Sequence, residues 1–416
     1  MHRNIVAASI AVSSIVLSLV GGVTAAAQSY EVLAALCNTL ADPELRLRGC
    51  DAVIKAGKAT PADMAIAWGI RGTAYSDMGQ VDRAIQDYDQ SIKFEPDLPA
   101  TYIYRGNAYI AKGQYDRAQQ DFDRALKLAP EAVLAFVGHG IVYGSKGQYD
   151  RSLQAFDQAL KLDPDAASAL SNRGLTYNKM GQYDRAIRDL DRALKLAPDA
   201  LAFTARGDAY NRKGEYDRAI QDYDRSLKLK PDDPDALINR GIAYMGKDQC
   251  DLAIRGFDRA LEIRPDDANA LFNRGLCYFE TAQYDHALQD YDRVVKLKPD
   301  FVGAFRQRCS TRSVLGGPPE TALANCNEAL RLTPNDPLLL KSRGLAYLKM
   351  NQPAAAIPDY DAALKIAPGD AGALYGRGVA RRRKGDVKGG DADIVAAKAS
   401  QSDIADNFAS WGVREK

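Results

Sequence analysis

The chain has 416 residues and a formal net charge of +1, because 55 basic side chains nearly balance 54 acidic ones. Arg3 is the only charged residue within residues 1–27, so the rest of the chain is neutral overall. This balance argues against a general nucleic-acid binder and against a protein that binds acidic membrane surfaces.

Residues 1–27 are typical of a targeting signal. Arg3 precedes an apolar run from Ile5 to Val20, and three alanines at 25–27 provide small residues for cleavage before Gln28. The sequence therefore predicts a cleavable signal and an exported protein. The alternative is an uncleaved membrane anchor, because the apolar run nearly reaches the length of a spanning helix.

Cysteine usage agrees with export, because disulfides are the default in oxidising compartments. The six cysteines fall into three pairs that are close in sequence, namely Cys37 and Cys50, Cys250 and Cys277, and Cys309 and Cys326. Fifteen connectivities are open to six cysteines. We expect the local one, because residues of one helical hairpin or of adjacent hairpins are neighbours.

From about residue 65 the chain repeats a pattern roughly every 34 residues, a period typical of stacked helical hairpins. The clearest mark is an Arg-Gly pair, whose glycines are Gly72, Gly106, Gly174, Gly207, Gly241, Gly275, Gly344 and Gly378. His139-Gly140 and Arg308-Cys309 fill the two gaps. A stack of this kind shifts the search for function from one catalytic site to recognition along a surface.

Residues 168–198 illustrate the predicted hairpin. Leu170 and Gly174 lie on one face of a first helix, and Gly181 ends that helix in a left-handed conformation. Leu190 belongs to the buried stripe of a second helix. We expect Gly174 to let the two helices approach closely, with Leu190 over the glycine.

The pattern resembles the tetratricopeptide repeat family over about residues 65–400. Its first copy carries the motif at six positions, Trp68, Gly72, Tyr75, Ala84, Tyr88 and Pro96. The resemblance implies an all-α fold, a right-handed α-solenoid of about ten helix-turn-helix repeats with a groove lined by the first helices. Arginine before the glycine, where the family more often has leucine, resembles exported proteins of Gram-negative bacteria. We therefore expect a periplasmic or secreted location.

The predicted organisation has four parts, a signal peptide in residues 1–27, an N-terminal capping helical pair in 28–64, the repeats in 65–400 and a C-terminal capping helix in 401–416. In the last part, Ile404, Phe408 and Trp411 are expected to cover the final apolar face. Terminal repeats need such caps for solubility.

Two features predict contacts within the repeats. In the eighth repeat Cys309 replaces the glycine and Cys326 replaces the ring that should touch it, which predicts a disulfide inside the repeat. Asp-Tyr-Asp recurs on the second helices, and we expect each arginine to pair with the first aspartate of its own hairpin. The alternative is a solvated stripe of ordinary pairs such as Arg117 with Asp121.

The search for catalytic chemistry finds no motif. The three histidines have no metal-binding spacing, and no Walker loop or GxSxG sequence occurs. Carboxylates are abundant, but they recur with the repeat, whereas a catalytic pair should be singular. The sequence predicts a non-enzyme without cofactor or metal. The basic run at 381–384 suits the end of a helix, with an anionic contact at the groove mouth as the alternative.

The expected groove is apolar and rich in amides, which suits an extended peptide or a partner helix. Its predicted residues are Ile103, Asn107, Ile110, Val137, Ile141, Ser171, Leu175, Asn178, Thr204, Asp208, Asn211, Phe272 and Leu276. The predicted function is a protein-interaction scaffold that binds a segment of an envelope protein, with no nucleic-acid or metal partner. The alternatives are a membrane-tethered assembly or secretion factor and a partner of enzymes that act on envelope polysaccharide.

Overall fold

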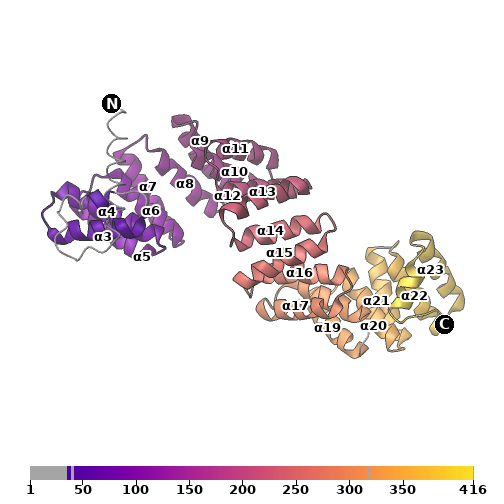
Figure 1. The fold of residues 1–416 in the computed structure, drawn as a ribbon. Coiled ribbons are helices and arrows are strands. Elements are labelled where there is room, and N and C mark those ends of the chain that lie inside the picture. Colours follow the sequence, from indigo (N-terminus) through magenta and orange to yellow (C-terminus); the bar gives the residue numbers. More distant parts are fainter. Residues whose placement is uncertain (1–34, 39–41, 316–317, 416) are drawn as a thin grey trace. The chain divides into compact units, whose positions relative to one another are not determined.

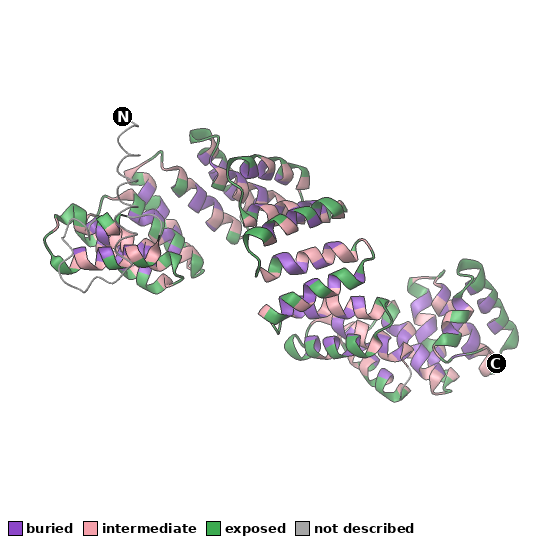
Figure 2. Cartoon of the chain, viewed as in Figure 1, coloured by how far each residue is buried: buried purple, intermediate pink, exposed green. Residues whose placement is uncertain are grey.

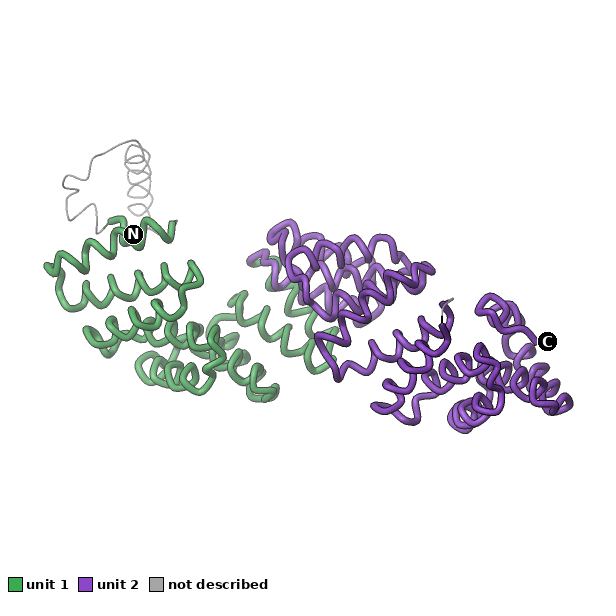
Figure 3. The backbone as a smooth tube through the Cα atoms, turned by 90° about the horizontal axis from the view of Figure 1, so that it is seen from below, with its two compact units in different colours: residues 1–196 green, residues 197–416 purple. Residues whose placement is uncertain are grey.

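The computed structural model describes residues 35–38, 42–315 and 318–415, and the regular elements of this part of the chain are helices (Figure 1). The targeting signal and cleavage position predicted within residues 1–28 lie outside the described residues. Two compact units divide the chain, unit 1 at residues 1–196 and unit 2 at residues 197–416 (Figure 3). Across the described ranges, every helix is too short or too polar to span a bilayer.

In the described residues from Asp42 onward, unit 1 contains the helix α3 and four helical hairpins. Its helices are α3 (Pro43–Ala56), α4 (Pro61–Asp77), α5 (Val81–Phe94), α6 (Pro99–Ala111), α7 (Tyr115–Leu128), α8 (Val133–Ser145), α9 (Tyr149–Leu162), α10 (Ala167–Lys179) and α11 (Tyr183–Leu196). The first and second helices of each hairpin pack against one another, and the second helices α5, α7 and α9 each pack on the next first helix.

Unit 2 continues with six hairpins and a short last helix. Its helices are α12 (Ala200–Arg212), α13 (Tyr216–Leu229), α14 (Pro234–Met245), α15 (Cys250–Ile263), α16 (Ala268–Glu280), α17 (Tyr284–Leu297), α18 (Val302–Val314), α19 (Pro319–Leu332), α20 (Pro337–Lys349), α21 (Pro353–Ile366), α22 (Ala371–Arg383), α23 (Val387–Ser400) and α24 (Ile404–Ser410). The fold is the predicted all-α repeat architecture.

Apart from the α18–α19 turn, which lies partly outside the described residues, each hairpin turn contains a left-handed residue. Gly113 adopts a φ of 69° between α6 and α7, a conformation that costs glycine little. In three repeats of unit 2 the same turn is made by Asp248, Ala282 and Asn351, with φ between 53° and 59°. Asp and Asn tolerate this conformation better than alanine does, so Ala282 carries the backbone strain.

Close approach of the two helices depends on the glycine slot, as predicted. A Cβ atom at Gly106 would lie 2.7 Å from Phe122 Cε1, and one at Gly174 would lie 2.7 Å from Leu190 Cγ. Phe122 and Leu190 are completely buried, and such residues form the buried stripe along the hairpins in Figure 2. Each glycine is therefore matched to one large side chain of its own hairpin.

The predicted arginine–aspartate pair is confirmed where the second helix carries that aspartate, and the arginine has an additional partner. Arg240 and Arg308 contact the preceding hairpin instead. Arg105 donates through Nε and NH2 to both oxygens of Asp121, at 2.9 and 2.7 Å, and through NH1 to Asp89 of the preceding hairpin, at 2.6 Å. The same two-sided contact is made by Arg71, Arg173, Arg274 and Arg377. The alternative of an Arg117–Asp121 pair is wrong, because Arg117 donates to Gln114. The arginine thus joins its own hairpin and the previous one.

Within each unit the first helices of consecutive repeats also contact one another, as α6 does with α8 and α20 with α22. Within the described residues, consecutive second helices do not make this contact. The first helices therefore line the inner side of each stack, which is where the resemblance places the groove.

Candidate functional site

All thirteen predicted groove residues share three places on the first helices. They lie three residues before, one residue after or four residues after the glycine slot, and these places are called groove positions below. Asn107 is exposed and most of the others are half-buried, whereas Ile103 and Val137 are buried between helices. The partly exposed members are the ones that can offer atoms to another molecule.

A cavity of about 510 Å³ lies on the inner side of unit 1 and includes Asn107. Its walls come from α3, α4 and α6, and it combines apolar side chains such as Ile66 and Ile70 with the hydroxyl of Thr73. Tyr104 is 43% exposed at this cavity and stacks on Tyr88, with ring centroids 6.2 Å apart. Apolar and hydrogen-bonding groups therefore face the same space.

Arg46 and Asp77 form an ion pair at this cavity. Its NH2 group donates to Asp77, and NH1 lies 3.4 Å from Thr73 Oγ1. The Arg46 side chain is only 9% exposed, and its Nε has no hydrogen-bond partner. Because its guanidinium is paired with Asp77 and Thr73, Arg46 holds these two side chains at the cavity wall.

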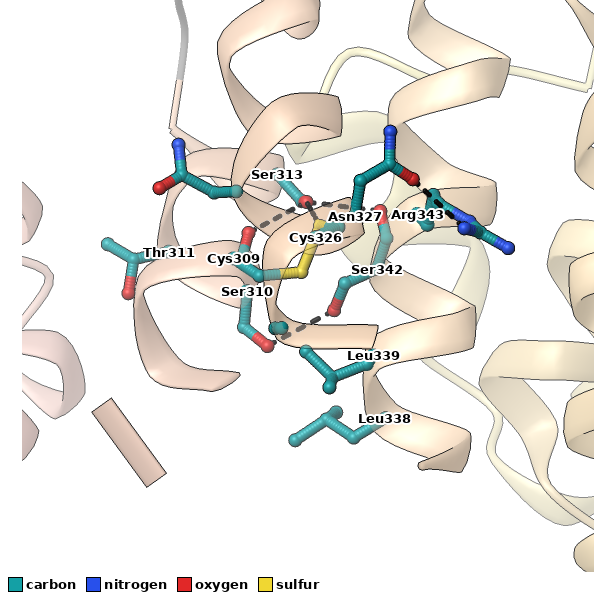
Figure 4. Close-up of a disulfide and its surroundings, with 12 residues drawn as sticks. Cys309, Ser310, Thr311, Ser313, Cys326, Asn327, Leu338, Leu339, Ser342 and Arg343 are labelled. Atoms are coloured by element: carbon teal, nitrogen blue, oxygen red, sulfur yellow. Dashed lines mark hydrogen bonds between the residues drawn. A yellow bond between two sulfur atoms is a disulfide. The ribbon is translucent and has the colours of Figure 1, made fainter. Parts of the chain in front are cut away.

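A second cavity, of about 200 Å³, lies in unit 2. Its lining residues are Phe279, Ser310, Ser313, Val314, Leu338, Lys341, Ser342, Leu345, Tyr360, Gly372, Phe408 and Trp411. Figure 4 shows Ser310 and Ser342 directed toward one another beside the nearby disulfide, with their hydroxyl oxygens 3.1 Å apart. The Tyr360 hydroxyl is buried without a partner.

Other predicted groove residues in unit 2 are engaged inside the fold. Asp208 accepts hydrogen bonds from the Tyr223 hydroxyl at 2.7 Å and from Asn239 Nδ2 at 2.9 Å. Burial raises the pKa of Asp208 to about 6. Phe272 packs edge-on against Phe301, with centroids 4.9 Å apart. Asp208 and Phe272 therefore support neighbouring helices in addition to facing the inner side.

The sequence prediction omitted several residues of both cavities. Thr73, Ser310 and Leu345 each follow a glycine slot directly, as Asn107 does. Extending the same spacing to the first, eighth and ninth repeats would have found them. Arg46 lies before the repeats, and no periodic signal points to it.

The cysteines follow the prediction in two pairs of three. Cys37–Cys50 and Cys309–Cys326 are disulfides. The predicted third bond is absent, because Cys250 and Cys277 are free and buried. Cys250 Sγ lies 3.1 Å from Glu280 Oε2 and donates to that carboxylate, which satisfies the thiol without a bond between the repeats.

Histidine and carboxylate side chains form no metal centre within the described residues. His139 takes the place of the arginine, and its Nε2 lies 3.2 Å from Asp123 Oδ1. Burial lowers the pKa of His139. Its position is that of a repeat variant of the arginine contact to the preceding hairpin.

Comparisons with known proteins agree with the architecture. Models described as TPR repeat match residues 72–110 and 207–248, and models described as tetratricopeptide repeat match 99–132, 140–205, 268–301 and 342–390. No curated protein sequence matches the chain.

Several solved structures are similar to parts of the chain. MamA is 26% identical over 38% of this chain and 94% of its own, with a TM-score of 0.36. YrrB, described as a TPR protein with an unusual peptide-binding site, is 24% identical over 44% and 95%, with a TM-score of 0.38. The Pseudomonas aeruginosa protein pilF is 19% identical over 50% and 94%, with a TM-score of 0.46. The family models together match more than half of the residues, and the chain belongs to the tetratricopeptide repeat family.

Proposed function

We propose that the protein is a non-enzymatic interaction scaffold and that it binds an extended segment of an envelope protein at the inner side of its first helices. The observation that carries this proposal is the 510 Å³ cavity of unit 1. It has the size and the mixed lining of sites that hold a partner by a few anchoring groups.

The chemistry of that cavity favours a peptide. Asn107 offers an amide that both donates to and accepts from a peptide backbone. Tyr104 supplies a rigid, partly exposed ring, which is a common anchor in protein interfaces. Apolar side chains of the segment would cover Ile66 and Ile70.

The envelope location rests on the disulfides and the predicted signal. Two disulfides within the described residues favour an oxidising compartment. With residues 1–27 removed, the protein is periplasmic or secreted. With the apolar run retained, it is a membrane-tethered assembly or secretion factor. Sequencing of the mature N-terminus separates the two, because a chain that starts at Gln28 has lost the tether.

Site-directed photo-cross-linking in envelope extract tests the binding site. A photoreactive residue at Tyr104 or Asn107 should trap the same partner protein, whereas one at Arg117 on α7 should not, because Arg117 is exposed and lies outside the cavity lining. Thr73→Val combined with Asn107→Ala should weaken the captured complex by about tenfold or more, through two lost hydrogen bonds. Equal trapping at all three positions would remove the cavity from the mechanism.

A further inference from the structure

The C-terminal segment, residues 401–415, folds back onto the first helix of the last repeat. Phe408 of α24 is buried, and its ring lies 4.8 Å from that of Tyr375 on α22. Ile404 and Val413 are also buried. Tyr375 stands three residues before Gly378 and therefore occupies a groove position, so the apolar part of the segment lies on the inner side of the stack.

The polar contacts of the segment use the same side of α22. Tyr375 Oη donates to Glu415 Oε1 at 3.1 Å, and Arg382 NH1, at the groove position four residues after the glycine slot, lies 3.3 Å from Glu415 Oε2. Arg383 donates to the carbonyl oxygen of Arg414 at 3.0 Å. The segment is held as a bound peptide is held, by an aromatic anchor, a carboxylate on arginine and a backbone carbonyl.

The second helix of the last repeat contributes one further contact. Lys398 on α23 donates to Glu415 Oε1 at 2.7 Å, and α24 packs against α23 as well as α22. The hydrogen bond from Lys398 lowers the pKa of Glu415, so the carboxylate is charged at neutral pH. Within the basic run at 381–384, Arg381, Arg382 and Arg383 occupy the last turn of α22 as predicted, and Arg382 also contacts the Glu415 carboxylate.

An open space adjoins the docked segment. Phe408 and Trp411 form one wall of the 200 Å³ cavity, and the opposite walls are groove positions of α18 and α20, including Ser310 and Leu345. The buried Tyr360 hydroxyl, which has no partner, also lines this space. A partner that enters the cavity from α18 meets the C-terminal segment at Phe408 and Trp411.

We propose that α20 and α22 form a second peptide-binding site, specific for a segment with an aromatic anchor followed by a carboxylate, and that residues 401–415 occupy this site until such a partner displaces them. The proposal extends the proposed function, because it takes the inner side of the first helices as the binding surface. The partner would carry the same groups as the chain's own segment, an aromatic ring and a carboxylate. A purely structural cap is the competing explanation.

The test uses the full chain and a labelled synthetic peptide with the sequence of residues 401–415. A loosened variant carries Phe408→Ala and Glu415→Gln, which removes the anchor and the charge but keeps the chain length. The loosened variant should bind the peptide at least about tenfold more tightly than the parent chain, because the parent's tethered segment competes. A control peptide with alanine in place of the phenylalanine should bind neither chain.

Several outcomes overturn the proposal. Equal affinity of both chains, or no binding to either, means that the segment is not a displaceable ligand. Loss of hydrogen-exchange protection in α22 and α23 of the loosened variant makes the segment an obligatory cap. Concentration-dependent dimers that exchange the segment make a second copy the occupant. Cross-linking at Tyr104 and Asn107 reports on unit 1 alone, so failure here is distinguishable from failure of the proposed function.

Discussion

The second and eighth repeats hold the two helices of their hairpins together by different contacts. In the second repeat, Phe122 covers Gly106 and Arg105 forks onto a buried aspartate of its own hairpin. In the eighth, the Cys309–Cys326 disulfide replaces the glycine and ring, and Arg308 reaches only Asp292 of the preceding hairpin, at 3.3 Å. The glycine and the ring have therefore changed together, whereas the arginine has kept only its contact with the preceding hairpin.

The ion pair of the second repeat gives the largest expected effect. Asp121→Ala leaves Arg105 largely buried without its forked partner and should lower the free energy of unfolding by about 3–5 kcal/mol. Native-state hydrogen exchange in α6 and α7 measures the loss locally. Asp89→Ala is the matched control, because Asp89 is 43% exposed, and it should cost about 1 kcal/mol or less. Equal losses would make the buried partner no more important than the exposed one.

The eighth repeat should depend on its covalent bond instead. Replacing Cys309 and Cys326 by alanine opens a loop with a sequence separation of 17 and should destabilise the hairpin by about 3 kcal/mol. Urea denaturation of the variant and of the parent chain, both without a reductant, measures this, because a reductant would also open Cys37–Cys50. The pair Cys309→Gly and Cys326→Phe restores the arrangement of the second repeat and should recover part of the loss. If this pair recovers none of the lost stability, the disulfide and the glycine–phenylalanine contact are not equivalent.

Much of the hairpin follows from the sequence because its contacts are periodic. The glycine with its covering ring, the arginine with its first aspartate, and the Cys309–Cys326 bond each occupy fixed places in one repeat. The contact of Arg105 with Asp89 was missed, because it joins two hairpins and depends on how they stack. The same reason applies to Arg46 and to Glu415, which lie outside the repeats and reach the inner side through the fold of the chain ends.

The fifth repeat shows a third arrangement of the contact at the glycine slot. Tyr223 covers Gly207, and the Tyr223 hydroxyl donates to Asp208. The pKa of Asp208 is about 6 in the folded protein, above the value of about 4 for an unperturbed aspartate. Between these values the folded state binds more protons than the unfolded state, so the free energy of unfolding falls as pH rises from about 4 to about 6.

Asp208→Asn should remove this contribution to the pH dependence and stabilise the protein at pH 7, by on the order of 2 kcal/mol. Urea unfolding of the variant and the parent at pH 4 and pH 7 gives their difference in unfolding free energy at each pH. The titrations of the other carboxylates largely cancel in this difference. The matched control is Asp224→Asn, a half-buried carboxylate of the same repeat that contacts Arg240. A variant that is destabilised at pH 7 but not at pH 4 would show that the charged carboxylate is needed by Tyr223.

The smallest expected effect compares the turns of the second and seventh repeats. Gly113 and Ala282 both adopt left-handed backbone, with φ of 69° and 59°, and no atom lies within 4 Å of a Cβ placed on Gly113. Steric crowding from neighbours is therefore absent at Gly113, and backbone conformation alone decides the cost there. Gly113→Ala should destabilise its hairpin by about 1 kcal/mol, and Ala282→Gly should stabilise its own by about 0.5–1 kcal/mol. Thermal unfolding of the two variants and the parent measures both changes in stability and their direction. If Ala282→Gly is also destabilising, the alanine methyl contributes packing that outweighs the strain, and the two turns are not interchangeable.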